Sequence, residues 1–352
     1  MKRLFGIDLL KAVAMVMVVS LHIMGRGGVL NTCAQHSHSL QYGICSLFHT
    51  ACMCSVNCFV LATGFIMSRH TFKYARIFAL WGEVVFYSLA IALVAVVFFP
   101  SVPIGWQDWL KAVMPIAFNR YWFISCYVGL FFTIPFLNQL LMSLERQEQR
   151  RLLLTGFGLL SLLPCLSGND MFAHHFGYSL IWFYFLYLWA GYIALNEVWR
   201  RVSVGRCCLA FLLAMGASVG LGIFYGRLER TVGLVGNGWG QYASPLILIE
   251  ATSLLILAAK IEIKSLVLKR LIAYLAPSIV SVYVIHSNGV FRQMVAWNGR
   301  FAFLADYGVF GLVGSVLGFA VAIFIGCVLV DVARRESWAL IVRTLHGVLP
   351  HR

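Results

Sequence analysis

The stretch FGIDLLKAVAMVMVVSLHIM, residues Phe5–Met24, decides the fold class. A helix of about 20 mostly apolar residues can cross the roughly 30 Å hydrocarbon core of a bilayer. Within this stretch lie three ionisable residues, Asp8, Lys11 and His22. At about 100° per residue, Lys11 and His22 project from the same helix face, roughly 16 Å apart along the axis. Charges at this depth are costly, so we expect that face to turn toward the bundle interior or a water-filled cavity.

The composition extends this interpretation to the whole chain. Apolar residues make up 61% of the sequence and charged residues 11%, whereas soluble domains have about 25% charged residues. The sequence therefore predicts an all-α, polytopic transmembrane helical bundle of about ten spans, forming a single domain over residues 1–352. The apolar segments run approximately over 5–24, 43–68, 79–99, 121–142, 151–165, 177–195, 206–225, 242–259, 271–288 and 307–331.

The positive charge follows the topology rather than pointing to nucleic acid. The net charge is +14, and most of the lysines and arginines fall in alternate loops of the predicted bundle. By the positive-inside rule, those loops and both termini are cytoplasmic. We therefore expect membrane lipids, and no nucleic acid, as surroundings of the chain.

The cysteines do not form a metal-binding pattern. Cys45, Cys52, Cys54 and Cys58 share one apolar segment, where cysteine behaves as a small hydrophobe. No Cys-x-x-Cys pair with a matching partner occurs, so no metal site is expected. Cys33, in the first outer loop, has no obvious partner for oxidation.

Polar and aromatic residues recur at one depth of the predicted bundle. If both termini are cytoplasmic, odd-numbered spans run outward and even-numbered spans run inward. Several spans then place such residues near the outer surface: His22, His49, Trp122, Tyr127, Tyr283 and His286. Glu250 falls near the middle of the eighth span, and we expect it to face the interior.

These outer residues are suited to acyl transfer. An imidazole can take the proton from an acceptor hydroxyl because its pKa lies near operating pH. A neighbouring tyrosine or histidine can stabilise the oxyanion that forms. A proton-coupled transporter uses similar residues, so the pattern alone leaves both classes open.

A basic cluster follows the second span. Arg69, Lys73 and Arg76 are spaced four and three residues apart, which predicts one helical face. Such a face suits a polyphosphate, such as the phosphates of coenzyme A. Ordinary positive-inside anchoring explains the cluster equally well.

Five motifs, in order, resemble the membrane acyltransferase-3 family of bacterial integral-membrane O-acyltransferases. The first, GIDLLKAVAMVMVVSLHIM, is similar to the family's Asp-x-Leu-Arg-Gly-x-Ala…His signature, with Lys11 where arginine is usual and Ala12 where glycine is common. The ending CFVLATGFIMSRH resembles a Ser-Gly-Phe ending, with Thr63 for serine. The run KYARIFALW is similar to a basic Arg-Ile-x-Pro-x-Tyr region, with Ala79 for proline. The remaining two are RYWFISCYVGLFFTIPFLN and SVYVIHSNGV.

The resemblance implies transfer of an acyl group, often acetyl from acetyl-CoA, to a hydroxyl of a surface polysaccharide, lipid-linked glycan or wall component. It implies a multi-pass protein of the bacterial inner membrane, with acyl-CoA as a co-substrate and no permanently bound cofactor. A homo-oligomer is left open. The expected catalytic residues are His22, Lys11 and Asp8; the donor-binding residues are Arg69, Lys73 and Arg76; and the acceptor-binding residues are Trp122, Tyr127, Tyr283 and His286.

Two alternatives remain at this point. One is a proton- or ion-coupled transporter or flippase for glycans or organic anions, in which Asp8, Lys11 and Glu250 carry the coupling charges. The other is an inactive homologue, because Lys11 is a point charge where arginine would offer a planar fork.

Overall fold

The computed structural model describes residues 3–36, 39–70, 74–232 and 238–348. Within these ranges the regular structure is helical, with nine helical segments long and apolar enough to cross a membrane, or ten if one bent pair counts as a span. Each of the ten predicted segments coincides with one of them. The prediction of an all-α bundle of about ten spans is therefore confirmed.

The α-helices have the following bounds: α1 Phe5–Met24, α2 Val29–Ala34, α3 Leu40–Met53, α4 Ser55–Met67, α5 Ala75–Phe98, α6 Trp106–Val113, α7 Trp122–Ser143, α8 Arg146–Phe157, α9 Leu163–Ser167, α10 Leu180–Leu195, α11 Val198–Arg201, α12 Val204–Val232, α13 Pro245–Lys260, α14 Leu266–Leu275, α15 Ile279–Ser287, α16 Gly289–Met294 and α17 Gly308–Val348.

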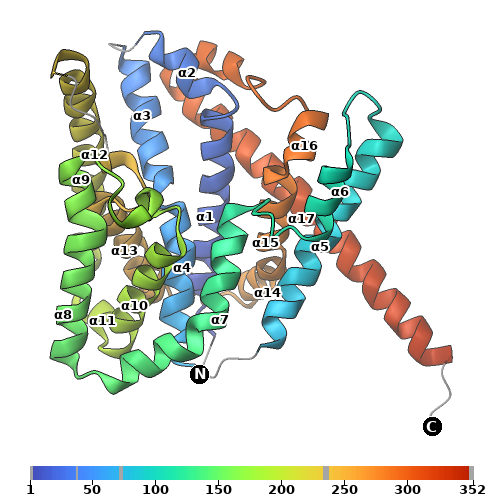
Figure 1. Ribbon diagram of the computed structural model, residues 1–352, viewed down its shortest axis with the longest axis horizontal. Helices are drawn as coiled ribbons and strands as arrows, with labels where there is room; N and C mark the ends of the chain where they lie inside the picture. Colours follow the sequence, from blue (N-terminus) through green and yellow to red (C-terminus); the bar gives the residue numbers. More distant parts are fainter. Residues whose placement is uncertain (1–2, 37–38, 71–73, 233–237, 349–352) are drawn as a thin grey trace.

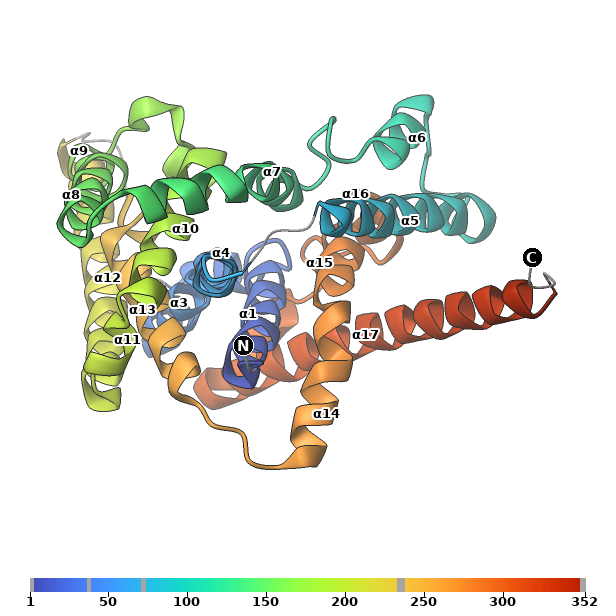
Figure 2. The ribbon, with the colours of Figure 1, turned by 90° about the horizontal axis from the view of Figure 1, so that it is seen from below.

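Helix α1 lies at the centre of the bundle (Figure 2), in contact with α3, α4, α13, α15 and α17. Apolar side chains spread round most of its circumference, as expected for a helix buried by neighbours on several sides. The first helix begins and the last helix ends on the same side of the bundle (Figure 1), as an even number of spans requires. The end of the bundle that carries His22, α2 and α16 is called the histidine end below, and the opposite end, where α1 begins, is called the basic end.

The tightest packing brings α4 against α10. Almost every residue of α4 is buried, and at Gly64 the two backbones approach so closely that a Cβ atom would lie 2.6 Å from the Tyr187 carbonyl oxygen. Only glycine leaves room for this approach. The contact fixes α10 even though its span is broken, since Met171–Gly177 and Leu180–Leu195 meet at a bend of 71°.

The last helix is longer than the sequence analysis expected. Segment 307–331 was predicted as a span, whereas α17 continues as one helix of 41 residues to Val348. The continuation, VARRESWALIVRTLHGV, contains several alanine, leucine, arginine and glutamate residues, which favour a helix, and no proline. Its far part projects away from the other helices (Figure 1).

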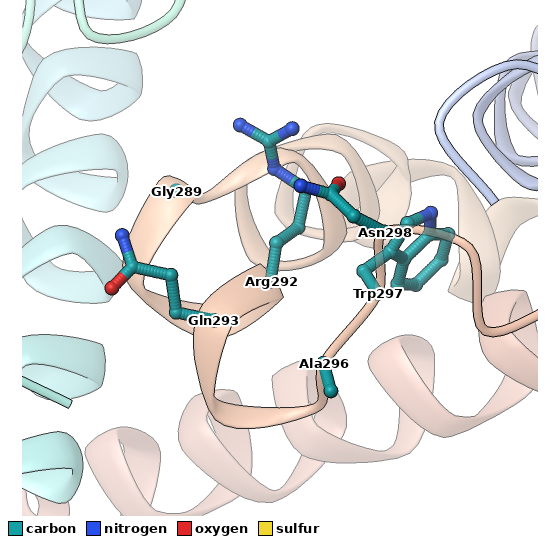
Figure 3. A pocket seen from close by; sticks show the side chains of 6 residues that line it. All are labelled: Gly289, Arg292, Gln293, Ala296, Trp297 and Asn298. Carbon is teal, nitrogen blue, oxygen red and sulfur yellow. The ribbon is translucent and has the colours of Figure 1, made fainter. Parts of the chain in front are cut away.

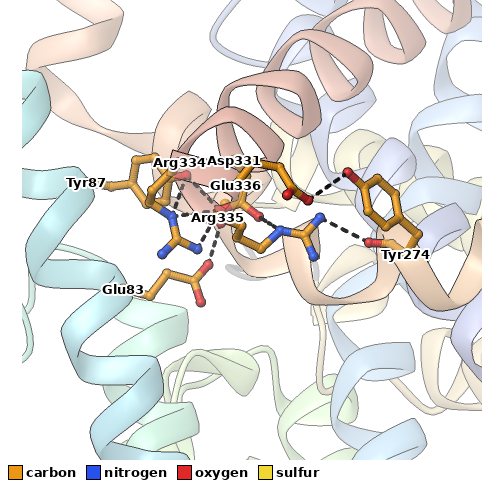
Figure 4. A network of polar contacts seen from close by, with 8 residues as sticks. Glu83, Tyr87, Tyr274, Asp331, Arg334, Arg335 and Glu336 are labelled. Atoms are coloured by element: carbon orange, nitrogen blue, oxygen red, sulfur yellow. Dashed lines mark hydrogen bonds and ion pairs between the residues drawn. The ribbon is translucent and has the colours of Figure 1, made fainter. Parts of the chain in front are cut away.

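A buried polar network ties α17 to α5 and α15 (Figure 4). The Asp331 carboxylate is fully buried and accepts hydrogen bonds from the Tyr87 hydroxyl at 2.7 Å, the Ser281 hydroxyl at 2.8 Å and the Arg334 guanidinium at 2.7 Å. The Ser281 hydroxyl also contacts the Glu83 carboxylate, so the two carboxylates share its single proton. A charge inside a bundle is tolerated when several donors satisfy it, so this network fixes the position of α15, the helix that carries Tyr283 and His286.

Candidate active site

Two histidines meet inside the histidine end of the bundle. The ring centroids of His22, on α1, and His286, on α15, lie 5.0 Å apart with the ring planes at 51°. His286 is fully buried, whereas His22 keeps part of its surface accessible. The His22 Nδ1 atom is buried and makes no hydrogen bond within the described residues. The face of α1 that carries His22 therefore turns to protein rather than to lipid.

The hydrogen bond of His286 fixes which of its nitrogens is basic. Its Nδ1 lies 2.5 Å from the Val282 carbonyl oxygen. A carbonyl can only accept, so Nδ1 carries the proton and Nε2 carries the free lone pair of the neutral ring. That Nε2 lies 3.4 Å from the Ser287 hydroxyl. Residue 286 therefore offers a proton acceptor to the site.

The chain beyond α1 is joined by hydrogen bonds to the loop beyond α16. The Gly299 amide donates to the Arg26 carbonyl at 3.0 Å, and the Phe301 amide donates to the Gly27 carbonyl at 2.9 Å. A Cβ atom on Gly27 would lie 2.1 Å from the Ile23 carbonyl oxygen, so the turn needs glycine there. The Trp297 indole donates to the His22 carbonyl at 3.1 Å. These bonds fix the end of α1, which carries His22, against the segment that follows α15 and α16, which continues from His286.

A pocket of about 390 Å³ opens beside this pair. Its walls are Gly289, Arg292, Gln293, Ala296, Trp297 and Asn298 (Figure 3). The Trp297 ring centroid lies 6.4 Å from that of His286, so one indole separates the pocket from the histidine pair. Residues 289–298 are an outer loop in the topology expected from the sequence, which does not predict this pocket. The sequence feature that could have indicated it is the presence of an arginine, two side-chain amides and a tryptophan within ten residues.

The predicted acceptor residues form a connected aromatic cluster. Tyr283 packs edge-on against His286, with centroids 6.1 Å apart, and lies 5.4 Å from the Phe123 ring. Phe123 in turn stacks on Tyr127 at 5.4 Å and meets Trp122 at 6.1 Å. Of the four predicted acceptor residues, His286 is therefore a member of the histidine pair and Tyr283 contacts it.

Trp122 and Tyr127 are engaged elsewhere. Trp122 packs against Tyr178, with centroids 4.6 Å apart, and stacks on Tyr242 at 5.8 Å. The Tyr127 hydroxyl and the Thr63 hydroxyl share a hydrogen bond of 2.6 Å. Neither residue lines the pocket beside the histidines.

At the basic end, Asp8 pairs with Arg3 and not with Lys11, which lies one turn further along α1. Its carboxylate accepts from the Arg3 guanidinium at 2.6 Å, and among the described residues Lys11 has no hydrogen bond or ion pair. Lys11 keeps part of its surface accessible within the bundle. Asp8 and Lys11 lie one turn apart in the sequence, which would allow them to pair. In the structure the Asp8 carboxylate is instead paired with Arg3, which lies just before the helix.

The prediction that Arg69 and Arg76 share one helical face is wrong. Helix α4 ends at Met67, the chain turns through residues 68–70, and α5 begins at Ala75. Arg69 lies over the Phe65 ring, whereas Arg76 is exposed and contacts the Met67 sulfur at 3.3 Å. Lys73 lies outside the described residues.

A second pocket, of about 420 Å³, occupies the basic end. It lies where α1 begins and the linker between α13 and α14 passes, and it combines apolar walls with three cations, Arg3, Lys264 and Lys269, and one carboxylate, Glu262. The Arg3 guanidinium and the Lys269 ammonium both lie against the Phe5 ring, at 5.4 and 6.0 Å. In the sequence these cations counted only toward the topology, because Arg3, Lys264 and Lys269 come from different parts of the chain and share no helical spacing.

Two other residues named from the sequence lie apart from this chemistry. Glu250 faces the interior as expected, fully buried, with both carboxylate oxygens free of hydrogen bonds to the described residues. His49 has no ring contact with the histidine pair among the described residues. Across the described ranges, no group of three His, Cys, Asp or Glu side chains is arranged to hold a metal ion.

The acyltransferase domain of the acyltransferase-3 family matches residues 4–332. The match runs from the residue before α1 to the residue after Asp331, and so covers both histidines and, apart from Arg3, the residues that line both pockets. Comparison with curated proteins and with solved structures gave no match. The helical bundle and the match over nearly the whole chain lead to one conclusion: this chain belongs to the acyltransferase-3 family and is a multi-pass membrane acyltransferase.

Proposed function

We propose that this protein moves an acyl group, acetyl in the first instance, from a cytoplasmic acyl-CoA to a hydroxyl of a surface polysaccharide, lipid-linked glycan or wall component in a bacterial inner membrane. In this orientation the basic end faces the cytoplasm and the histidine end faces outward. The family membership supports acyl transfer, and the concentration of cations in the loops of the basic end supports the orientation.

The observation that carries the proposal is the contact between His22 and His286. Two imidazoles with ring centroids 5.0 Å apart, one with its Nε2 atom next to the Ser287 hydroxyl at 3.4 Å, form a site that can accept and return a proton. Partial accessibility of His22 inside the bundle supports a route for substrate to this residue. We assign His22 as the general base.

The proposed reaction is a direct transfer. The acceptor hydroxyl gives its proton to His22 while its oxygen attacks the thioester carbonyl carbon, and the oxyanion that forms is stabilised by a nearby donor. The carbon–sulfur bond then breaks, the acyl group stays on the glycan oxygen, and the coenzyme A thiolate takes up the proton. Tyr283, whose ring meets His286, is the candidate oxyanion donor, because the N–H of His286 is already bound to Val282.

For the donor we propose the basic end. The pocket between Arg3, Lys264 and Lys269 offers cations for phosphates and apolar walls beside them. Of the donor-binding set expected from the sequence, Arg69 and Arg76 are proposed as peripheral contacts of the donor, while Lys73 lies outside the described residues. Lys11, with its charge and accessible surface on the same face of α1 as His22, lies along the path of the thioester.

The test is transfer of label from radiolabelled acetyl-CoA to glycan by the purified protein in lipid nanodiscs. His22→Ala should lower the rate by about 10²-fold or more, the contribution of a general base. His49→Ala is the matched control, because His49 lies at a similar predicted depth but makes no ring contact with the pair. Glycan flux across vesicles without label transfer would contradict the proposal and favour the transporter.

A further inference from the structure

Two arginines lie beside the histidine pair without a carboxylate partner in the described part of the chain. Arg26, on the turn after α1, is within electrostatic reach of His286 and of Arg292 on α16. Burial lowers the pKa of the Arg292 guanidinium, and the positive charge of Arg26 lowers that pKa further. Two cations held close in this way are stabilised by an anion that both can reach.

The topology gives no other reason for these cations. At the histidine end, which faces outward in the proposed orientation, the positive-inside rule selects against arginine rather than for it. The Arg292 Nε atom is buried and makes no hydrogen bond to the described residues, although a buried guanidinium N–H normally has a partner. A ligand on the accessible side of Arg292 would provide that partner.

The rest of the pocket carries groups typical of sugar recognition. The side chains of Gln293 and Asn298 are exposed and make no hydrogen bond to other described residues, so both amides are available as donors and acceptors. Figure 3 shows the side chains of Arg292, Trp297 and Asn298 around the opening. At about 390 Å³, the pocket is large enough for a single sugar unit.

We propose that this pocket binds an anionic sugar group, a phosphate or carboxylate of the acceptor, through Arg292, while Gln293 and Asn298 bind its hydroxyls and the nearby charge of Arg26 adds electrostatic attraction. The Trp297 indole separates the pocket from the imidazoles. The reacting hydroxyl is therefore on a neighbouring part of the same glycan, presented to His22 and His286. The inference deepens the proposed function and rests on it for the transfer step, but the binding of an anionic sugar stands without that step.

The experiment measures equilibrium binding to the full chain in nanodiscs, without acyl-CoA, so that transfer is not needed for a signal. The probes are glucose, glucose 6-phosphate, glucuronic acid and inorganic phosphate. At least one of the two anionic sugars should bind about tenfold or more tightly than glucose, the effect of one charge-assisted pair, and the two arms distinguish phosphate from carboxylate. Added salt should weaken that preference.

Variants identify the residues responsible. Arg292→Gln should remove the preference for the anionic sugar, and Arg292→Lys should keep part of it. Arg26→Gln, at an exposed side chain, should weaken binding of the anionic sugar and leave binding of glucose unchanged. Arg300→Gln is the matched control, an exposed arginine of the same loop outside the pocket, and should bind as the unaltered chain does. An unchanged thermal midpoint without ligand shows that each variant is folded.

Several results would overturn the inference. Glucose binding as tightly as both anionic sugars would remove the role of charge, and inorganic phosphate binding as tightly as glucose 6-phosphate would remove the role of the sugar. If both Arg292→Gln and Arg26→Gln still preferred the anionic sugar to glucose, the sugar would bind at another site. Displacement of the sugar by coenzyme A would also show that it binds elsewhere. A chain that binds anionic sugars but transfers no acyl group would support the inference and contradict the proposed function.

Discussion

The imidazoles of His22 and His286 lie 5.0 Å apart, one on the first helix of the bundle and the other on α15. Neither helix can rotate freely about its axis. The bonds from Gly299 to Arg26 and from Trp297 to the His22 carbonyl hold the end of α1, and the Asp331 network holds α15. The pair is therefore a property of the whole bundle rather than of one motif.

The two histidines should behave as one unit in mutants. We expect His286→Ala to lower the acyl-transfer rate strongly, and the double variant His22→Ala/His286→Ala to be little worse than His22→Ala alone. Residues that act together give such non-additive losses. The measurement is kcat/KM for all four proteins. If the loss of kcat/KM in the double variant equalled the product of the two single losses, His286 would act independently of His22.

The basic end should control affinity for the donor. Arg3→Ala, Lys264→Ala and Lys269→Ala should each raise the KM for acyl-CoA by about two- to fivefold, as expected for partly exposed charges, with kcat nearly unchanged. The effect should shrink as salt is added. Arg150→Ala, at an exposed position on α8, is the control. If Arg69→Ala and Arg76→Ala raised the KM while the pocket variants did not, the donor would bind where the sequence first suggested.

The packing of α4 against α10 should be sensitive to one methyl group. Gly64→Ala would place a Cβ 2.6 Å from the Tyr187 carbonyl oxygen, and overpacking of this kind costs about 1–3 kcal/mol. Gly82→Ala, on an exposed face of α5 with open space around the added Cβ, should be neutral or stabilise the helix by about 0.5–1 kcal/mol. Thermal midpoints of the two variants in the same detergent provide the comparison. Equal midpoints would mean that the helices separate without cost.

The buried carboxylate of α17 should be essential for stability. Asp331→Asn removes the negative charge to which Arg334 and Tyr87 donate hydrogen bonds. Disrupting a buried ion pair of this kind lowers the free energy of unfolding by about 3–5 kcal/mol. The control is Glu336→Gln, because Glu336 is exposed and meets Tyr274 at 3.5 Å, a contact worth about 0–1 kcal/mol. Thermal unfolding measures both. A midpoint for Asp331→Asn equal to that of the control would contradict this role for the network.

The sequence predicted the helices well because a bilayer leaves the backbone few choices. A long apolar run must form a helix to satisfy its amides, so each predicted segment appears as a helical segment. The end of α17 could not be predicted in this way. The charged residues after 331 mark the end of the apolar span. They do not interrupt the helix, which continues to Val348.

The site was only partly predictable. Depth placed His22, Tyr283 and His286 correctly at one level, but contact depends on how each helix is rotated about its axis, and that rotation is set by tertiary packing. Spacing failed for Arg69 and Arg76, because the chain turns between them. The position of Arg292 in a pocket wall could not be predicted for a related reason, since a short helix in a connecting segment has no periodicity to reveal which residues converge.

Helix α17 is too long for the membrane that the other helices fit. Its 41 residues extend about 61 Å, roughly twice the thickness of the hydrocarbon core, so even a steep tilt leaves a portion outside it. Exposed Trp338, Leu340 and Ile341, next to Arg343, have the composition of a segment that rests at the lipid headgroups. Because Asp331 lies on the same unbroken helix, the segment with this composition and the residue that fixes α15 belong to one continuous element.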